Sequence, residues 1–189
     1  MNDSPLPRHT ARLLLRRFAD ADLLPFQAYR HDPEVGRFQG WSVLDNDAAA
    51  AFIAGMATAD FAVPGEWFQI AVADRSNDRL VGDIGICLRD DVARTAEIGF
   101  SVAPAAQRRG IGTEAVSAAL ALLFESGKVE RIEGITDARN TPSIRLLERV
   151  GMRLDGTREA QFKGETCTEH VYSLPRATWR EFAPMPTHQ

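Results

Sequence analysis

The stretch that most constrains the fold is QRRGIGTEA, residues 107–115, because it joins a predicted strand to a predicted helix. Gly110 and Gly112 lack side chains, so backbone N–H groups there can face a ligand closely. A helix that begins at this point adds the positive end of its dipole, which favours an anion such as a phosphate group. Arg108 and Arg109 add mobile positive charge. The stretch therefore predicts a phosphate-binding loop within a β-α-β unit.

A dinucleotide-binding fingerprint is one alternative for this loop. A β-α-β unit is present, and Glu130 and Glu133 lie near the distance at which that fingerprint places an acidic residue. However, the loop from Val102 to Gly110 is too long for its tight turn and contains Pro104, and only one further strand–helix pair follows. A dinucleotide is therefore disfavoured. A second alternative is a glycine-containing helix start flanked by two solvated arginines.

The hydrophobic pattern along the rest of the chain alternates between strands and helices. With 189 residues we expect one domain over 1–182 and a polar tail over 183–189. Asp20 and Thr141 are predicted helix N-caps, and Gly127 and Gly151 are predicted helix ends. The fold class is therefore α/β (α+β), with about seven strands in a mixed sheet and about four helices packed on it. The predicted strands are residues 11–18, 67–74, 80–88, 95–102, 131–136, 152–164 and 165–174, and the predicted helices are 20–32, 45–60, 112–127 and 141–151.

Composition excludes several classes of protein. The formal charge of −4 argues against nucleic acid as the main partner. The sequence has no run of about 18 apolar residues, so we expect no membrane span. Cys87 and Cys167 lie far apart with no histidine at ligand spacing, which predicts neither a zinc site nor a disulfide framework. A reducing cytoplasm is the expected compartment.

Two longer blocks carry a resemblance to a known family. EIGFSVAPAAQRRGIGTEAVSAAL and DARNTPSIRLLERVGMRLDG resemble the GCN5-related N-acetyltransferase (GNAT) superfamily, and most of all its branch of ribosomal-protein N-terminal acetyltransferases. The family's pyrophosphate-loop pattern, Q/R-x-x-G-x-G/A, is matched by Gln107, Gly110 and Gly112. Its second pattern, R-N-x-x-S followed by G, is matched by residues 139–151. The resemblance extends from residue 10 to residue 179.

The resemblance implies acetyl-coenzyme A (acetyl-CoA) as the co-substrate and no metal. The pyrophosphate would lie on the backbone N–H groups of residues 108–113. The pantetheine arm would lie between strands 95–102 and 131–136, which splay apart in this family. The implied cofactor-binding residues are Phe100, Ser101, Val102, Gln107, Arg108, Arg109, Gly110, Ile111, Gly112, Thr113, Asn140 and Ser143.

Amide formation requires a neutral amine, whereas a lysine-like amine has a pKa of about 10.4 and is protonated at neutral pH. Glu97 is the candidate base, acting directly or through a water molecule. The alternative is a strand-edge glutamate paired with an arginine. A backbone N–H near residues 100–102 could stabilise the oxyanion. Ser143 is the candidate hydrogen-bond donor to the sulfur and Asn140 a contact for the pantetheine arm, although both residue types also cap helices.

The acceptor is the least constrained part of this expectation. The candidate acceptor residues are Tyr29, Trp41, Trp67 and Glu169. Further candidates are the aromatic residues Phe38 and Phe68 and the acidic residues Glu66 and Glu165, and each aromatic could instead belong to the core. We expect acetyl transfer to a primary amine by direct attack in a ternary complex, with a protein N-terminal α-amine as the acceptor. Alternatives are a small amine of the polyamine or aminoglycoside type, or an inactive CoA-binding sensor module. The sequence leaves the oligomeric state open, with a homodimer among the options.

Overall fold

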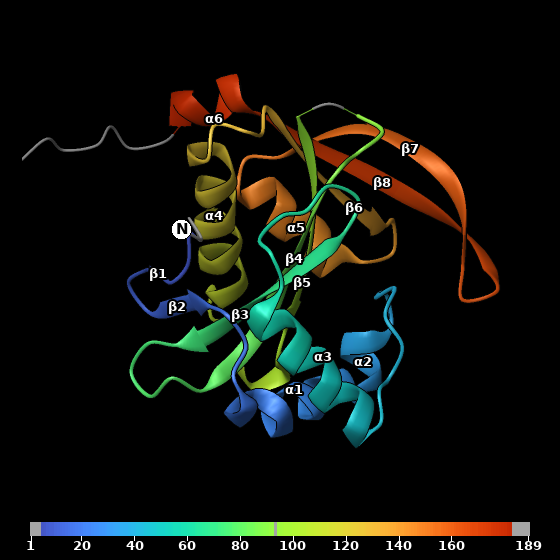
Figure 1. Ribbon diagram of the computed structural model, residues 1–189. Coiled ribbons are helices and arrows are strands. Elements are labelled where there is room, and N and C mark those ends of the chain that lie inside the picture. Colours follow the sequence, from blue (N-terminus) through green and yellow to red (C-terminus); the bar gives the residue numbers. More distant parts are fainter. Residues whose placement is uncertain (1–4, 93, 183–189) are drawn as a thin grey trace, which may run out of the picture.

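The computed structural model describes residues 5–92 and 94–182, so the predicted tail 183–189 lies outside the described part. It contains one mixed sheet with strand order β1-β2-β3-β4-β5-β6-β8-β7 (Figure 1). The strands are β1 (Arg8–His9), β2 (Leu13–Arg16), β3 (Trp67–Asp74), β4 (Leu80–Leu88), β5 (Thr95–Val102), β6 (Arg131–Asp137), β7 (Arg153–Phe162) and β8 (Glu165–Pro175). The helices are α1 (Leu23–Arg30), α2 (Pro33–Gly36), α3 (Asn46–Thr58), α4 (Ile111–Glu125), α5 (Thr141–Arg149) and α6 (Arg176–Phe182).

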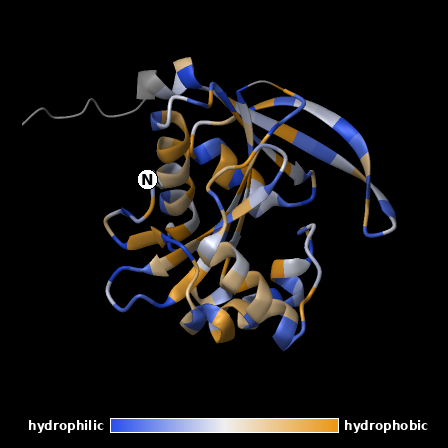
Figure 2. Cartoon of the chain, viewed as in Figure 1, coloured by the Kyte–Doolittle hydropathy of each residue, from blue (hydrophilic) through white to orange (hydrophobic). Residues whose placement is uncertain are grey.

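Helices cover both faces of the sheet. Ile70 and Val72 of β3 pack into a core with α4 and α5, whereas Ala71 between them packs with α1 and α3. Successive strand residues point to opposite faces, so the two cores lie on opposite sides of the sheet. Figure 2 shows that α4 is predominantly hydrophobic, whereas the β7–β8 hairpin, which extends from the body in Figure 1, carries many hydrophilic residues.

Among the named strands of the described residues, β5 and β6 are the one parallel pair, with α4 as the connection. These strands pair only from Thr95 to Glu97 on β5, although β5 continues to Val102. Beyond that point β6 stays paired with β8 on its other side up to Asp137. The two strands therefore diverge, which confirms the predicted α/β fold with a sheet splayed in its middle.

The structure corrects several details of the prediction. The sheet has eight strands because the two-residue β1 pairs with β2, and the short helices α2 and α6 add to the expected number. Asp20 is not an N-cap; a 3-10 turn begins there, and Asp22 instead accepts from the Ala19 N–H and from Arg16. Thr141 is the first residue of α5 and not its cap, because Asn140 accepts the capping hydrogen bond.

Candidate active site

A groove of about 830 Å³ opens where β5 and β6 diverge. Its walls come from β5, the loop that leads into α4, the end of β6, α5 and the residue before it, and the segment around α2. The predicted cofactor residues that line it are Phe100, Ser101, Val102, Gln107, Arg108, Gly110, Gly112, Thr113, Asn140 and Ser143. The structure thus brings the two sequence blocks together at one groove.

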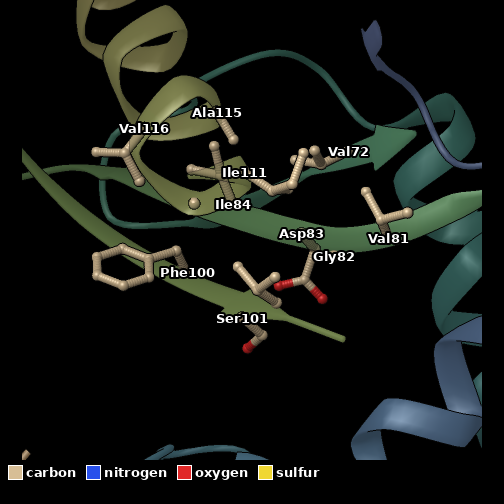
Figure 3. Close-up of a pocket in the computed structure, with 12 residues that line it drawn as sticks. Val72, Val81, Gly82, Asp83, Ile84, Phe100, Ser101, Ile111, Ala115 and Val116 are labelled. Carbon is tan, nitrogen blue, oxygen red and sulfur yellow. The ribbon is translucent and has the colours of Figure 1, made fainter. Parts of the chain in front are cut away.

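Arg109 and Ile111 of the predicted set do not line this groove. The Arg109 carbonyl accepts a hydrogen bond from Arg12 on the outer side of the loop. Ile111 is buried and borders a separate cavity between β4, β5 and α4 (Figure 3). That cavity measures about 10 Å³, which holds at most about one water molecule. It is a packing gap beneath the loop and not a ligand site.

The loop before α4 presents a run of unpaired backbone donors. None of the N–H groups of residues 108–113 has a hydrogen-bond acceptor within the described residues. Gly110 is the N-cap of α4 and has a φ of 75°, a left-handed conformation that suits glycine. A Cβ atom on Gly112 would lie 2.7 Å from Cδ1 of Leu146, so any larger residue there would displace the Leu146 side chain of α5. The geometry matches an anion site formed by backbone amides and a helix start.

Arginine side chains also line the groove. Arg108, Arg145 and Arg149 all line it, and no salt bridge to any of the three is found in the described part of the chain. Arginine side chains bind phosphate oxygens through charge-assisted hydrogen bonds. Arg145 and Arg149 lie on α5 one helical turn apart, a spacing that places both on one face. The sequence prediction did not include these two residues.

Two carbonyl groups of β5 accept hydrogen bonds from glutamine side chains. The Phe100 carbonyl accepts from Nε2 of Gln39 at 3.0 Å, and the Val102 carbonyl accepts from Nε2 of Gln107 at 2.9 Å. Gln107 therefore braces the strand end as well as lining the groove. Gln39, in the segment after α2, has no motif that could have indicated it from the sequence.

Glu97 is the last residue of β5 that pairs with β6, directly opposite Glu133. Its neighbours Ala96 and Ile98 are buried in the core on the α4 side, so its side chain points to the other face. Burial is the main cause that raises the pKa of Glu97, and the nearby carboxylate of Glu133 raises it further, whereas Arg89 opposes the shift. Arg89 Nη1 lies 3.7 Å from Glu97 Oε2. Both interpretations of Glu97, a base and an arginine-paired glutamate, are compatible with this geometry.

Asn140 and Ser143 lie at the start of α5, beside the groove. The Asn140 side chain accepts a hydrogen bond from the Ser143 backbone N–H at 3.3 Å, so its oxygen caps the helix. The Asn140 amide nitrogen and the Ser143 hydroxyl have no hydrogen-bond partner within the described residues. The capping interpretation is therefore correct for the Asn140 oxygen and leaves two polar groups available to a ligand.

The four predicted acceptor residues do not line the groove. Tyr29 is 1% exposed and its hydroxyl donates to buried Asp83, so the expectation that Tyr29 forms an acceptor wall is wrong. Trp41 packs against the guanidinium of Arg30. Trp67 is 45% exposed, and an added Cβ on Gly99 of β5 would lie 3.9 Å from its ring.

Glu169 pairs with Arg158 at 2.8 Å on the β7–β8 hairpin. Both side chains influence the pKa of Glu97, so they lie near it. Phe38, which follows α2 and was also predicted as an acceptor-wall residue, does line the groove.

Within the described residues, no group of three or more His, Cys, Asp or Glu side chains is arranged to hold a metal ion. The same part of the chain has no helix that is both long and apolar enough to cross a membrane.

A protein-family model described as an acetyltransferase (GNAT) domain matches residues 12–153. The chain belongs to the GNAT acetyltransferase family. This acetyltransferase is 30% identical over 172 residues to an uncharacterised N-acetyltransferase, YnaD, of Bacillus subtilis, a match that covers 90% of this chain and 97% of the relative.

Solved structures agree with the family. A GNAT acetyltransferase from Bacillus anthracis has a TM-score of 0.79 and 26% identity, and the match covers 89% of this chain and 98% of that chain. A candidate ribosomal-protein-serine acetyltransferase from Vibrio cholerae has a TM-score of 0.71 and 25% identity, over 88% of this chain and 95% of that chain. This protein is therefore an acyltransferase with the GNAT fold, a fold that uses acetyl-CoA as the acyl donor.

Proposed function

We propose that this acetyltransferase transfers the acetyl group of acetyl-CoA to a protein N-terminal α-amine by direct attack in a ternary complex. The observation that carries the proposal is the groove at the β5–β6 divergence, where unpaired N–H groups of residues 108–113 and the strand carbonyls of Phe100 and Val102 meet. The residues present fit a ligand with an anionic end and an extended amide-bearing arm. Acetyl-CoA has both features, and when bound it supplies the activated acyl thioester.

Distinct parts of the chain hold the two ends of the ligand in this proposal. The backbone amides of residues 108–113, with Arg108, Arg145 and Arg149, bind the phosphate groups. Backbone groups of Phe100 and Val102 and the Asn140 amide hold the arm, because these polar groups line the groove between the strands. The reactive end then lies along β5 toward Glu97, which directly precedes the groove-lining residue Ile98.

Glu97 accepts the proton that the attacking amine loses. A raised pKa, caused mainly by burial, makes its carboxylate a stronger base than an exposed glutamate. Arg89, whose Nη1 lies 3.7 Å from the carboxylate, opposes this rise in the pKa and favours the charged form. The Ser143 hydroxyl donates a hydrogen bond to the sulfur as the C–S bond breaks and the new C–N bond forms. A backbone N–H of residues 100–102 stabilises negative charge on the carbonyl oxygen.

The acceptor reaches Glu97 from the sheet face that carries Trp67 and the β7–β8 hairpin. All of β7 from Arg153 to Arg158 is exposed, as is Trp67, so this side can accommodate a peptide. The likeness to a candidate ribosomal-protein-serine acetyltransferase supports a protein acceptor. A small amine is the alternative, since Glu133 and Glu169 lie near Glu97, although Arg131 pairs with Glu133 and Arg158 with Glu169. For the compartment we propose the cytoplasm, since Cys87 and Cys167 are free thiols.

The test is release of free thiol from acetyl-CoA in the presence of N-terminal peptides, polyamines or aminoglycosides. The proposal predicts turnover with peptides that carry a free α-amine and none with the same peptides after N-terminal blocking. Turnover with small amines alone would show that the acceptor is a small amine, while the protein would still be an acetyltransferase. Binding of acetyl-CoA without thiol release from any amine would instead favour a sensor module.

A further inference from the structure

The N-terminal segment of the described chain contacts both ends of α4. Arg8 forms a salt bridge with Glu125, the last residue of α4. Thr10 and Arg12 contact Glu114 in the first turn of the same helix. Glu114 follows directly after the run of unpaired N–H groups, so the contact at this end adjoins the groove.

Glu114 accepts three hydrogen bonds from this segment. The Thr10 hydroxyl and the Arg12 backbone N–H donate to Oε1 at 2.6 and 2.8 Å, and Nε of Arg12 donates to Oε2 at 2.7 Å. The Glu114 side chain is only 18% exposed, so water competes poorly for the carboxylate. Burial alone would raise the pKa of Glu114, but these hydrogen bonds outweigh it and lower the pKa. The carboxylate thus holds the guanidinium of Arg12 in one orientation.

The same guanidinium reaches the backbone of the phosphate loop. Nη1 of Arg12 donates to the Arg109 carbonyl at 2.8 Å, and Nη2 lies 3.4 Å from where a Cβ on Gly110 would be. The Arg109–Gly110 peptide bond is trans, so its N–H points opposite to its C=O. Because Arg12 holds the carbonyl outside the loop, the Gly110 N–H faces the other way, and Gly110 lines the groove.

We propose that Arg12 is a positioning residue for the phosphate end of acetyl-CoA. It acts through the Arg109–Gly110 peptide: the guanidinium, oriented by Glu114, prevents that peptide from flipping and keeps the Gly110 N–H directed at the ligand. Gly110 is the residue most in need of such a restraint, since glycine samples alternative backbone conformations more readily than any other residue. Arg12 itself is not among the groove-lining residues. This inference rests on the proposed function, because it requires the phosphates to lie at this loop.

The test compares Arg12→Ala with Arg8→Ala, which removes a salt bridge from the same segment to the same helix but at the end far from the loop. Calorimetry gives the Kd for CoA, and ligand-observed NMR gives the Kd for pantetheine, which lacks the phosphates. Arg12→Ala should raise the Kd for CoA about tenfold, which corresponds to the loss of roughly one charge-assisted hydrogen bond. The Kd for pantetheine should stay unchanged. Arg8→Ala should change neither.

If Arg12 had only a structural role, Arg12→Ala would weaken the binding of CoA and pantetheine equally, or it would lower only the melting temperature. Either result would overturn the inference. Glu114→Gln is the second variant, in case Arg12→Ala does not fold; it keeps the side-chain shape, releases the guanidinium and should also weaken CoA selectively. If Arg12→Ala and Glu114→Gln bind CoA as tightly as the wild type does, only this inference fails. If the wild type does not bind CoA, the proposed function fails, and this inference fails with it.

Discussion

The buried ion pair between Asp83 and Arg30 gives a quantitative prediction about the stability of this fold. Asp83 of β4 is 2% exposed and accepts hydrogen bonds from the Tyr29 hydroxyl and from Nη2 of Arg30 at 2.8 Å. Arg30 is 7% exposed and is stacked on the rings of Phe26 and Trp41. This group joins α1 to the sheet next to Ser101 of β5, with which Asp83 is paired in register.

Asp83→Ala would leave the Arg30 guanidinium buried without its counter-ion. Removing one partner of a buried ion pair costs about 3–5 kcal/mol, because the remaining charge stays desolvated. For a chain of this size, a loss of about 1 kcal/mol in the free energy of unfolding lowers the melting temperature by about 2–4 °C. The melting temperature of Asp83→Ala should therefore fall by roughly 6–20 °C. Scanning calorimetry and urea unfolding would measure the change.

Glu130→Ala is the matched control for Asp83→Ala. Glu130 pairs with Arg94 at 2.7 Å, nearly the same distance, but both side chains are at least half exposed. Loss of this exposed ion pair should lower the free energy of unfolding by no more than about 1 kcal/mol. The double variant Asp83→Leu/Arg30→Met should recover much of the stability, since apolar replacement of a buried pair is often neutral. Equal effects of Asp83→Ala and Glu130→Ala would refute the reasoning, because burial would then make no difference.

Three further predictions concern the groove and its loop. Glu97→Gln should lower kcat while the Kd for CoA stays unchanged. Because the pKa of Glu97 is raised, the wild-type rate should fall in acid at a pH above the ordinary glutamate range, and the variant should lose this pH dependence. An unchanged rate would remove Glu97 from the mechanism. Gln39→Ala should lower the Kd for CoA about three- to tenfold in calorimetry, because it frees the Phe100 carbonyl from a competing donor; weaker binding would mean that Gln39 itself holds the ligand. Glu114→Gln should reduce the free energy of unfolding at neutral pH, and the difference from wild type should vanish as the pH falls through the lowered pKa of Glu114, below the ordinary value of 4.5; a difference that persists in acid would contradict the ion-pair explanation.

The central strands could be predicted from sequence, whereas the short peripheral elements could not. The predicted strands 67–74, 80–88 and 95–102 agree with β3, β4 and β5 residue for residue, because apolar residues packed on both faces and turns at both ends define them. β1 has two residues and α2 has four, and each is contacted from far along the chain: Arg8 of β1 by Glu125, and Gly36 of α2 by Lys163. Such short segments have no periodic signal of their own.

The same distinction applies to the site. The glycine loop and the Asn140–Ser143 segment were predicted because each is a local pattern with a backbone requirement, and both line the groove. Gln39 and Arg12 contact residues 61 and 97 positions away, and no local pattern reports such a pair. Tyr29 was misplaced for a related reason: an aromatic residue suits a pocket wall and a core equally well, and only its hydrogen bond to Asp83 decides between them.

The most direct test of the acetyl-CoA groove is hydrogen–deuterium exchange of the full chain with and without CoA, read out by peptide mass spectrometry. CoA should slow exchange in peptides that cover residues 98–102 and 108–113, because those backbone groups line the groove and the second run has no acceptor within the described chain. Exchange in the exposed β7 strand should stay unchanged, since it lies outside the groove. Unaltered exchange at both predicted stretches under saturating CoA would contradict the assignment of this groove as the acetyl-CoA site.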